Sequence, residues 1–145
     1  MITSFEGKYS FLSNFYACQT EYHNVKYPTS EHAYQAAKTS NPIQREAIKN
    51  ADTPDDAKRM GRRVEIKSNW DEIKDEVMYE IVLNKFKNKR MQAKLLATGN
   101  EILVEGNYWH DNYFGSCYCK KCLQKPKENN LGKILMRVRE ELKEA

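Results

Sequence analysis

Four side chains that could carry out acid–base or covalent chemistry fall on one face of a predicted helix. They are Glu31, Tyr34, Gln35 and Lys38, spaced at i, i+3, i+4 and i+7. Glu31 also lies in the first turn of this helix, where the helix dipole favours an ionised carboxylate. From this face alone, an ordinary half-solvated helix surface is the favoured interpretation, and a converging polar face that carries out chemistry is the alternative.

A second set of polar side chains is basic and lies near the end of a helix predicted to stop at Gly61. Lys58 and Arg62 are four residues apart and would project together. Because a guanidinium can hold a phosphate through two hydrogen bonds, we expect a phosphate site here. A solvated basic helix end is the alternative. Lys58 or Lys38 could instead supply an amine that forms a Schiff base with an opened sugar.

A second candidate carboxylate is Asp111, which lies in a predicted loop rich in aromatic residues. Partial burial among Trp109, Tyr113 and Phe114 could tune the pKa of this carboxylate. The alternative is a turn residue whose carboxylate accepts hydrogen bonds from nearby backbone N–H groups.

Three cysteines lie close together in the pattern Cys117-x-Cys119-x-x-Cys122. Three thiolates at this spacing can share a metal ion, and Cys18 or His110 would have to supply a fourth ligand. We expect no metal and three reduced thiols in an exposed loop, with a structural zinc site as the alternative.

The composition limits the class of protein. The 145 residues are 40% hydrophobic and 30% charged, which predicts one globular domain over residues 1–145 with a hydrophobic core. With no apolar run of membrane length and no leader segment at Met1, we expect a cytoplasmic protein with reduced cysteines. The net charge of +4 suits a phosphate-bearing ligand, but it is milder than a dedicated nucleic-acid-binding surface requires. The oligomeric state is left open.

The elements that must position these residues are predicted to be mostly helical. Aromatic residues punctuated by Gly7 in the first 27 residues predict two or three short strands and turns. A further short strand is predicted at 101–105, and an irregular loop over 106–130. The fold class is therefore mostly α-helical, or α+β with a few short N-terminal strands.

Capping residues mark where the helices begin. Thr29 or Ser30 can cap the first helix, and Thr53 precedes a proline and two aspartates that suit a helix start. Asn69 begins a capping box for a long helix that reaches about residue 88, and Asn130 caps the final helix. Further helices are predicted from Pro42 and around 91–96.

Several blocks of the sequence, in this order and spacing, resemble the NADAR domain family, also called YbiA-like. The resemblance runs from about Phe5 to Arg139. Two departures are His110, where the family usually has Gly, and the cysteine-bearing insertion after Gly115. The matching blocks are Phe5–Tyr16, Tyr27–Lys38, Ala57–Arg62, Trp70, Lys85-Phe86, Leu95–Gly99, Trp109-x-Asp111, Phe114-Gly115 and Asn130–Met136.

The resemblance implies a mostly helical single domain that acts on N-glycosidic bonds of ribose. We expect no cofactor. Two activities are associated with the family: removal of ADP-ribose from modified guanine in nucleic acid, and cleavage of phosphorylated ribosylamino-pyrimidine intermediates of riboflavin biosynthesis. We favour the first. A non-catalytic ADP-ribose or NAD-binding module and a zinc-stapled nucleic-acid-binding protein are the competing classes.

Breaking such a bond develops positive charge on the ribose, so a carboxylate is required nearby. Glu31 is the first candidate and Asp111 the second, while Lys38 or Lys58 would serve a covalent route. Aromatic rings could stack on a base or sugar, although Trp70 also heads a buried stripe and could be core. The candidate substrate-binding residues are Asn14, Tyr34, Gln35, Arg62, Trp70, Tyr108, Trp109 and Asn130.

Overall fold

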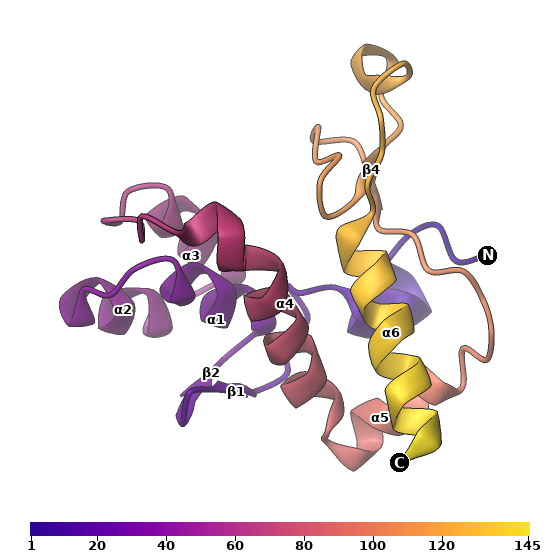
Figure 1. Ribbon diagram of the computed structural model, residues 1–145, viewed down its shortest axis with the longest axis horizontal. Coiled ribbons are helices and arrows are strands. Elements are labelled where there is room, and N and C mark those ends of the chain that lie inside the picture. The colour runs from indigo at the N-terminus through magenta and orange to yellow at the C-terminus, as the bar shows by residue number, and fades with distance from the viewer. The chain divides into compact units, whose positions relative to one another are not determined.

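A computed structural model describes all residues from 1 to 145, and the chain packs as two compact units (Figure 1). One unit is the continuous segment Asn14–Lys87. The other combines Met1–Ser13 with Asn88–Ala145. The predicted fold class is confirmed, since helices dominate and the strands are short. No helix is long and apolar enough to cross a membrane.

The unit Asn14–Lys87 begins with a small hairpin. Strands β1 (Thr20–Tyr22) and β2 (Val25–Tyr27) pair antiparallel. The two residues between them, His23 and Asn24, both have positive φ, which is the conformation of the tightest hairpin turns. Two of the predicted N-terminal strands therefore form.

Four helices complete this unit. They are α1 (Ser30–Ala37), α2 (Pro42–Lys49), α3 (Pro54–Gly61) and α4 (Trp70–Phe86).

Helix α1 packs against the other three helices and against the hairpin, so every one of its residues is buried. The half-solvated surface that the spacing alone favoured for this helix is therefore wrong. Its alanines explain the packing, because small side chains let neighbouring elements approach on several sides.

Local capping explains most of the helix starts. The Oγ1 of Thr29 accepts a hydrogen bond from the His32 N–H at 3.1 Å, and the Oγ1 of Thr53 accepts one from the Asp56 N–H at 3.0 Å. The capping box predicted at Asn69 is wrong, since this residue precedes α4 but its side chain makes no capping bond.

The second unit contains α5 (Lys89–Leu96), which packs against α6 (Asn130–Glu144) and against the 3-10 helix η1 (Gly7–Leu12). Helix α4 ends at Phe86, two residues before the expected limit. The reason is that Asn88 caps α5 through its Oδ1, which accepts from the N–H groups of residues 90 and 91.

The strand predicted at 101–105 is wrong, because only Leu103 pairs, in an isolated bridge to Ile2. The predicted irregular loop after it contains two very short parallel strands, β3 (Gly106–Asn107) and β4 (Ser116–Cys117), and the 3-10 helix η2 (Lys120–Cys122).

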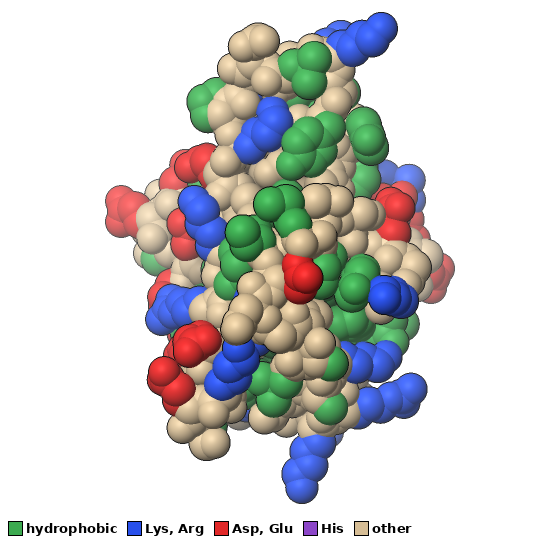
Figure 2. Space-filling model, turned by 90° about the vertical axis from the view of Figure 1, so that its right-hand side faces the viewer, with side chains coloured by type: hydrophobic (Ala, Val, Ile, Leu, Met, Phe, Trp, Pro, Cys, Tyr) green, Lys and Arg blue, Asp and Glu red, His purple; other side chains and the backbone are tan.

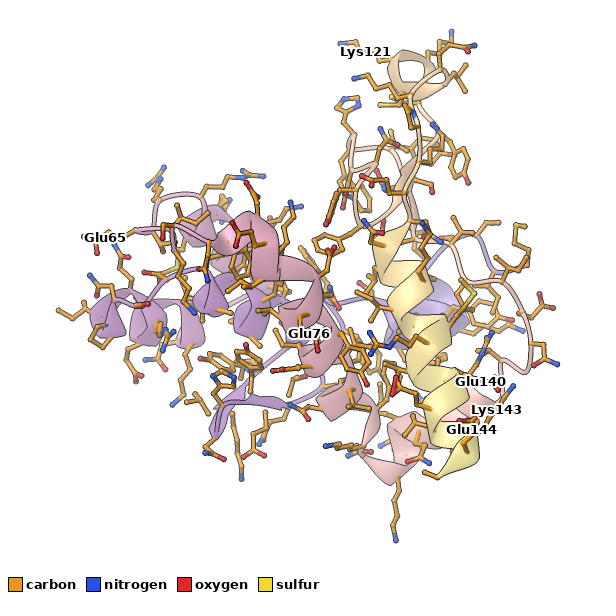
Figure 3. All side chains as sticks on the ribbon, in the orientation of Figure 1. Glu65, Glu76, Lys121, Glu140, Lys143 and Glu144 are labelled. Carbon is orange, nitrogen blue, oxygen red and sulfur yellow. The ribbon has the colours of Figure 1, made fainter.

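The prediction that Asn130 caps α6 is wrong, because Asn130 is the first residue of this helix. Asn129 occupies the capping place with φ of 49°, and its side chain links the N–H of Glu105 to the carbonyl oxygen of Leu103. Gly132 allows this approach, because a Cβ there would lie 2.1 Å from the Leu103 carbonyl oxygen. The side chains further along α6 are shown in Figure 3.

Candidate functional site

The polar face of α1 comes together as a buried group. The carboxylate of Glu31 is only 7% exposed and accepts a hydrogen bond at 2.7 Å from the Nε2 of Gln35, one helical turn later. The backbone N–H of Glu31 donates to the carbonyl oxygen of Asn14 at 3.0 Å. Glu31 is thus held at both its backbone and its side chain.

Helix α3 approaches this group at Gly61. A Cβ on Gly61 would lie 1.9 Å from the Oε1 of Gln35, which is closer than real contacts allow. This oxygen is buried without a hydrogen-bond partner. The amide of Gln35 therefore fits between the two helices with its nitrogen toward Glu31, and only glycine leaves room for it.

The aromatic members of the group are buried. Tyr34 and Trp70 are both buried, and their ring centroids lie 5.2 Å apart with a tilt of 58°. Trp70 is part of the hydrophobic core, which was the alternative considered for it from the sequence. Its contact with Tyr34 places it beside the polar face of α1. A role in binding substrate remains a prediction for both residues.

Lys38 follows α1 directly and is half-buried. Burial lowers the pKa of its amine, the carboxylate of Glu31 raises it, and the cations of Arg62 and Lys58 lower it further. The ammonium also lies 5.7 Å from the centroid of the Tyr34 ring. The amine of Lys38 therefore lies near one buried carboxylate, that of Glu31, and near two other cations, those of Lys58 and Arg62.

Two of the cations near Lys38 come from α3 and from its C-terminal cap. The Nζ of half-buried Lys58 lies 5.9 Å from the centroid of the Phe15 ring. Arg62 is exposed and occupies the C-terminal capping position of α3. A buried carboxylate near Lys38, with two more cations near that lysine, suits a ligand that carries phosphate next to a group on which positive charge develops.

His32 has a positioning role. The N–H of its ring Nε2 donates to the carbonyl oxygen of Ala51 at 3.0 Å, and its Nδ1 is hydrogen-bonded to the hydroxyl of Thr29 at 2.8 Å. The Oγ1 of Thr29 also accepts from the backbone N–H of His32 at 3.1 Å, so ring and backbone are both tied to the residue that caps α1. His32 thus fixes the start of α1, where Glu31 lies.

Lys85 was not predicted to be a site residue, and it appears above only in the matching block Lys85-Phe86. It is 2% exposed, and its Nζ lies 5.8 Å from the ring centroid of Tyr16 and 5.2 Å from that of Phe86. Burial lowers the pKa of this amine to about 7. The signal was present in the sequence, because Lys85 continues the i, i+4 series of Val77 and Ile81 on the buried side of α4.

In the other unit, Asp111 belongs to a tight turn. Its Oδ1 accepts from the N–H groups of Tyr113 and Phe114, both at 3.0 Å, which is the turn geometry considered as the alternative. Buried Asn107, which sequence reasoning missed, accepts from the N–H groups of Trp109 and Asp111 and donates to the Asp111 carbonyl oxygen.

The aromatic residues before this turn are accessible. Tyr108 is 72% exposed and Trp109 is 56% exposed, as a stacking surface for a base would require. The N–H of Asn130 donates to the carbonyl oxygen of Tyr113 and so joins the start of α6 to the same turn. The proposed roles of these residues and of Asp111 remain predictions.

A single group of side chains has the composition of a metal site. It contains His110, Cys117, Cys119 and Cys122. The thiols were expected in an exposed loop, but those of Cys117 and Cys122 are buried.

Charged side chains of both signs are interspersed on the face shown in Figure 2, in keeping with the mild net charge.

Comparisons with known proteins agree with this fold. The N-glycosidase YbiA of Escherichia coli is 35% identical over 141 residues, which cover 92% of this chain and 82% of that protein. An N-glycosidase of Nostoc punctiforme is 36% identical over 141 residues, which cover 93% of this chain and 86% of that protein. The solution structure of E. coli YbiA matches with a TM-score of 0.83 at 34% identity, covering 99% of this chain and 85% of that one.

A longer relative is a riboflavin biosynthesis protein of Vibrio vulnificus, 36% identical over 146 residues. These residues cover 96% of this chain but only 37% of that protein. The sequence model described as the NADAR domain matches residues 3–143, which include both compact units. The chain belongs to the NADAR domain family.

Proposed function

We propose that this chain is an N-glycosidase that hydrolyses the bond between ribose and nitrogen in a nucleotide-like substrate. The observation that carries the proposal is the buried carboxylate of Glu31, held by Gln35 and close to Lys38, which itself lies near the cations of Lys58 and Arg62. Two relatives of similar length are named N-glycosidases, which supports the reaction type.

In the direct route, the carboxylate of Glu31 stabilises the positive charge that develops on the ribose as the base departs. It can then accept a proton from the water that adds to the anomeric carbon. Gln35 contributes by fixing the carboxylate, since its hydrogen bond leaves little freedom for rotation. The cations hold the phosphate end of the substrate.

In the covalent route, the neutral amine of Lys38 adds to the anomeric carbon, and the base leaves with a proton. The sugar ring opens to an imine, which water later hydrolyses. Burial and the neighbouring cations lower the pKa of Lys38, so more of the amine is neutral than in a solvated lysine. Burial lowers the pKa of Lys85 further, to about 7, but this side chain is too deeply buried to meet a substrate.

For the substrate, we propose ADP-ribose attached to guanine in nucleic acid. The cations of Lys58 on α3 and of Arg62 at its C-terminal cap lie near Lys38, and such a set of cations suits a diphosphate. The second candidate is a phosphorylated ribosylamino-pyrimidine. The name of the Vibrio vulnificus relative favours it.

The test is mass spectrometry of the products formed from both substrates in parallel, with wild type and Glu31→Gln. We expect free ADP-ribose and repaired guanine from the first substrate, and no turnover by the variant. Gln keeps the shape and removes the charge, so the variant should keep the wild-type melting temperature. The matched control is Glu76→Gln on the exposed side of α4 (Figure 3).

Three outcomes would count against the proposal in different ways. Wild-type rates in Glu31→Gln would remove this carboxylate from the mechanism. Cleavage of the pyrimidine substrate alone would replace the substrate proposal with the second candidate. Tight binding of ADP-ribose without turnover of either substrate would identify a non-catalytic binding module.

A further inference from the structure

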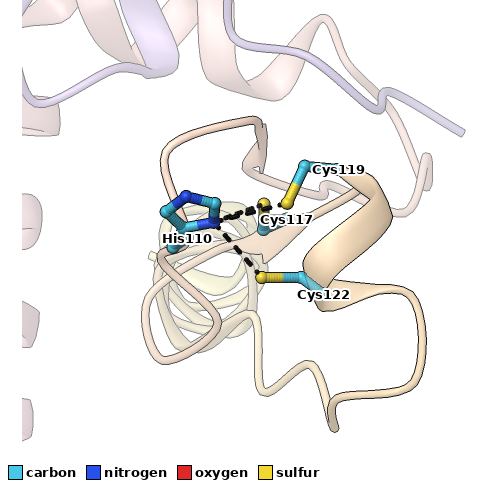
Figure 4. Close-up of side chains that lie close together, drawn as sticks. All are labelled: His110, Cys117, Cys119 and Cys122. Atoms are coloured by element: carbon cyan, nitrogen blue, oxygen red, sulfur yellow. Dashed lines mark hydrogen bonds between the residues drawn. The ribbon is translucent and has the colours of Figure 1, made fainter.

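Four potential metal ligands converge in the unit that contains α6. The Nδ1 of His110 and the sulfur atoms of Cys117, Cys119 and Cys122 all lie within 4.8 Å of one another (Figure 4). They come from three separate places: the turn after β3, strand β4 with the residues that follow it, and helix η2.

The distances fit a tetrahedral zinc ion. The Nδ1 of His110 lies 3.9 Å from the sulfur of Cys117, 3.3 Å from that of Cys119 and 3.4 Å from that of Cys122. With Zn–S bonds of ~2.3 Å and Zn–N bonds of ~2.0–2.1 Å, tetrahedral angles place nitrogen and sulfur about 3.6 Å apart. The observed distances bracket this value, so only small side-chain movements are needed to complete the coordination.

The backbone holds these ligands in place. The N–H of Cys117 donates to the Oδ1 of Asn112 at 2.9 Å, and Cys117 also pairs with Asn107 across β3 and β4. Cys122 is buried, and the amine of Lys127 donates to its carbonyl oxygen at 2.6 Å. Two ligands are thus part of hydrogen-bonded, buried structure.

The backbone conformation of His110 also indicates that its ring is a metal ligand. Its φ is 71°, a left-handed conformation that costs free energy for any residue with a Cβ. This conformation brings its ring to the three sulfur atoms. Coordination of a metal would compensate the strain.

The chemistry of the donor set selects the ion. Soft thiolate ligands exclude magnesium and calcium as preferred ions, and three cysteines with one histidine form a common structural zinc set. Four protein ligands also close the coordination sphere and leave no place for a reacting water. The set therefore suits a structural site and not a catalytic one.

We propose that His110, Cys117, Cys119 and Cys122 bind one structural zinc ion. The ion joins η2 to the turn that carries Trp109 and Asp111, and so fixes a segment that has little regular secondary structure of its own. Because the folded chain binds the ion far better than the unfolded chain does, binding stabilises this unit. The inference is independent of the proposed reaction.

The test is elemental analysis and native mass spectrometry of untagged, reduced protein grown with zinc. We expect about one zinc per chain and a lower melting temperature after chelation, restored by zinc alone. Cobalt added to the metal-free protein should give the visible absorption of a tetrahedral thiolate complex. This cobalt spectrum is measured on the wild type, so it does not depend on any variant folding.

The matched variants are Cys119→Ser, which removes a ligand, and Cys18→Ser, which removes the cysteine outside the group. His110→Gly removes the nitrogen ligand and also relieves the backbone strain. We expect Cys119→Ser and His110→Gly to lose zinc affinity at least tenfold, and Cys18→Ser to keep it. Reduced wild type that binds neither zinc nor cobalt would overturn the proposal. So would a purified protein whose mass shows a disulfide within the group that forms in preference to metal binding.

Discussion

Replacing Gly61 by alanine should disturb the candidate carboxylate although residue 61 does not touch it. The new Cβ would lie 1.9 Å from the Oε1 of Gln35, and contacts below 3.0 Å essentially never occur, so the amide must move by about 1.1 Å. Gln35 is only 3% exposed and has little free space. We therefore expect the 2.7 Å hydrogen bond from Gln35 to Glu31 to break.

The magnitude follows from that bond. A hydrogen bond to a charged group contributes about 1.5–3 kcal/mol, so the value of kcat/KM should fall roughly ten- to 150-fold. Overpacking should cost about 1–3 kcal/mol of unfolding free energy, offset in part by about 1 kcal/mol of better helix propensity for alanine.

The assay is a double-mutant cycle with Gln35→Ala, measured by steady-state kinetics and by denaturant unfolding. Removing the Gln35 side chain makes room for the new methyl group. In that background, Gly61→Ala should become neutral or stabilising and should cause no further loss of kcat/KM. Equal losses of activity in both backgrounds would refute the reasoning, because the effect of residue 61 would then bypass Gln35.

Three further predictions concern cationic side chains. Borohydride added during turnover should trap a ribosyl adduct on Lys38 if the covalent route operates; no adduct, together with full activity of Lys38→Arg and Lys58→Arg, would leave the direct route. Arg62→Ala should raise KM about ten- to 150-fold for a diphosphate substrate and much less for an unphosphorylated riboside, and an equal effect on both would show that Arg62 does not bind phosphate. Because burial lowers the pKa of Lys85 from 10.5 to about 7, the unfolded chain binds more protons between these values, so wild-type stability should rise from pH 7 toward pH 10. Lys85→Met should remove this slope and stabilise the protein by up to about 5 kcal/mol below pH 7, as unfolding by denaturant at several pH values would show.

Features that depend on neighbours in sequence were the most predictable. The starts of α1 and α3 rest on Thr29 and Thr53, whose hydroxyl groups bond to N–H groups only three residues later. The same local reasoning was wrong at Asn129 and Asn130, because a contact to Leu103 in another part of the chain decides where α6 begins. Long-range contacts of this kind leave no periodic signal in the sequence.

The candidate site divides in the same way. The i, i+4 spacing predicted that Glu31 and Gln35 lie together, because it depends on helix geometry alone. The burial of α1 and the fit of Gln35 against Gly61 depend on how helices pack, which spacing does not encode. For the metal ligands, the sequence left Cys18 and His110 as alternatives, and the fold places His110 with the other three.

The division of the chain has a consequence for the order of folding. The segment Asn14–Lys87 is continuous, so its hairpin and four helices can form a core as soon as they have left the ribosome. The other unit needs Met1–Ser13 to meet residues made much later, including Leu103, which pairs with Ile2. Its contacts close a long loop, which is slow for entropic reasons. The segment Met1–Ser13 should therefore be among the last parts of this sequence to reach its native place, although it is synthesised before the segment that it packs against.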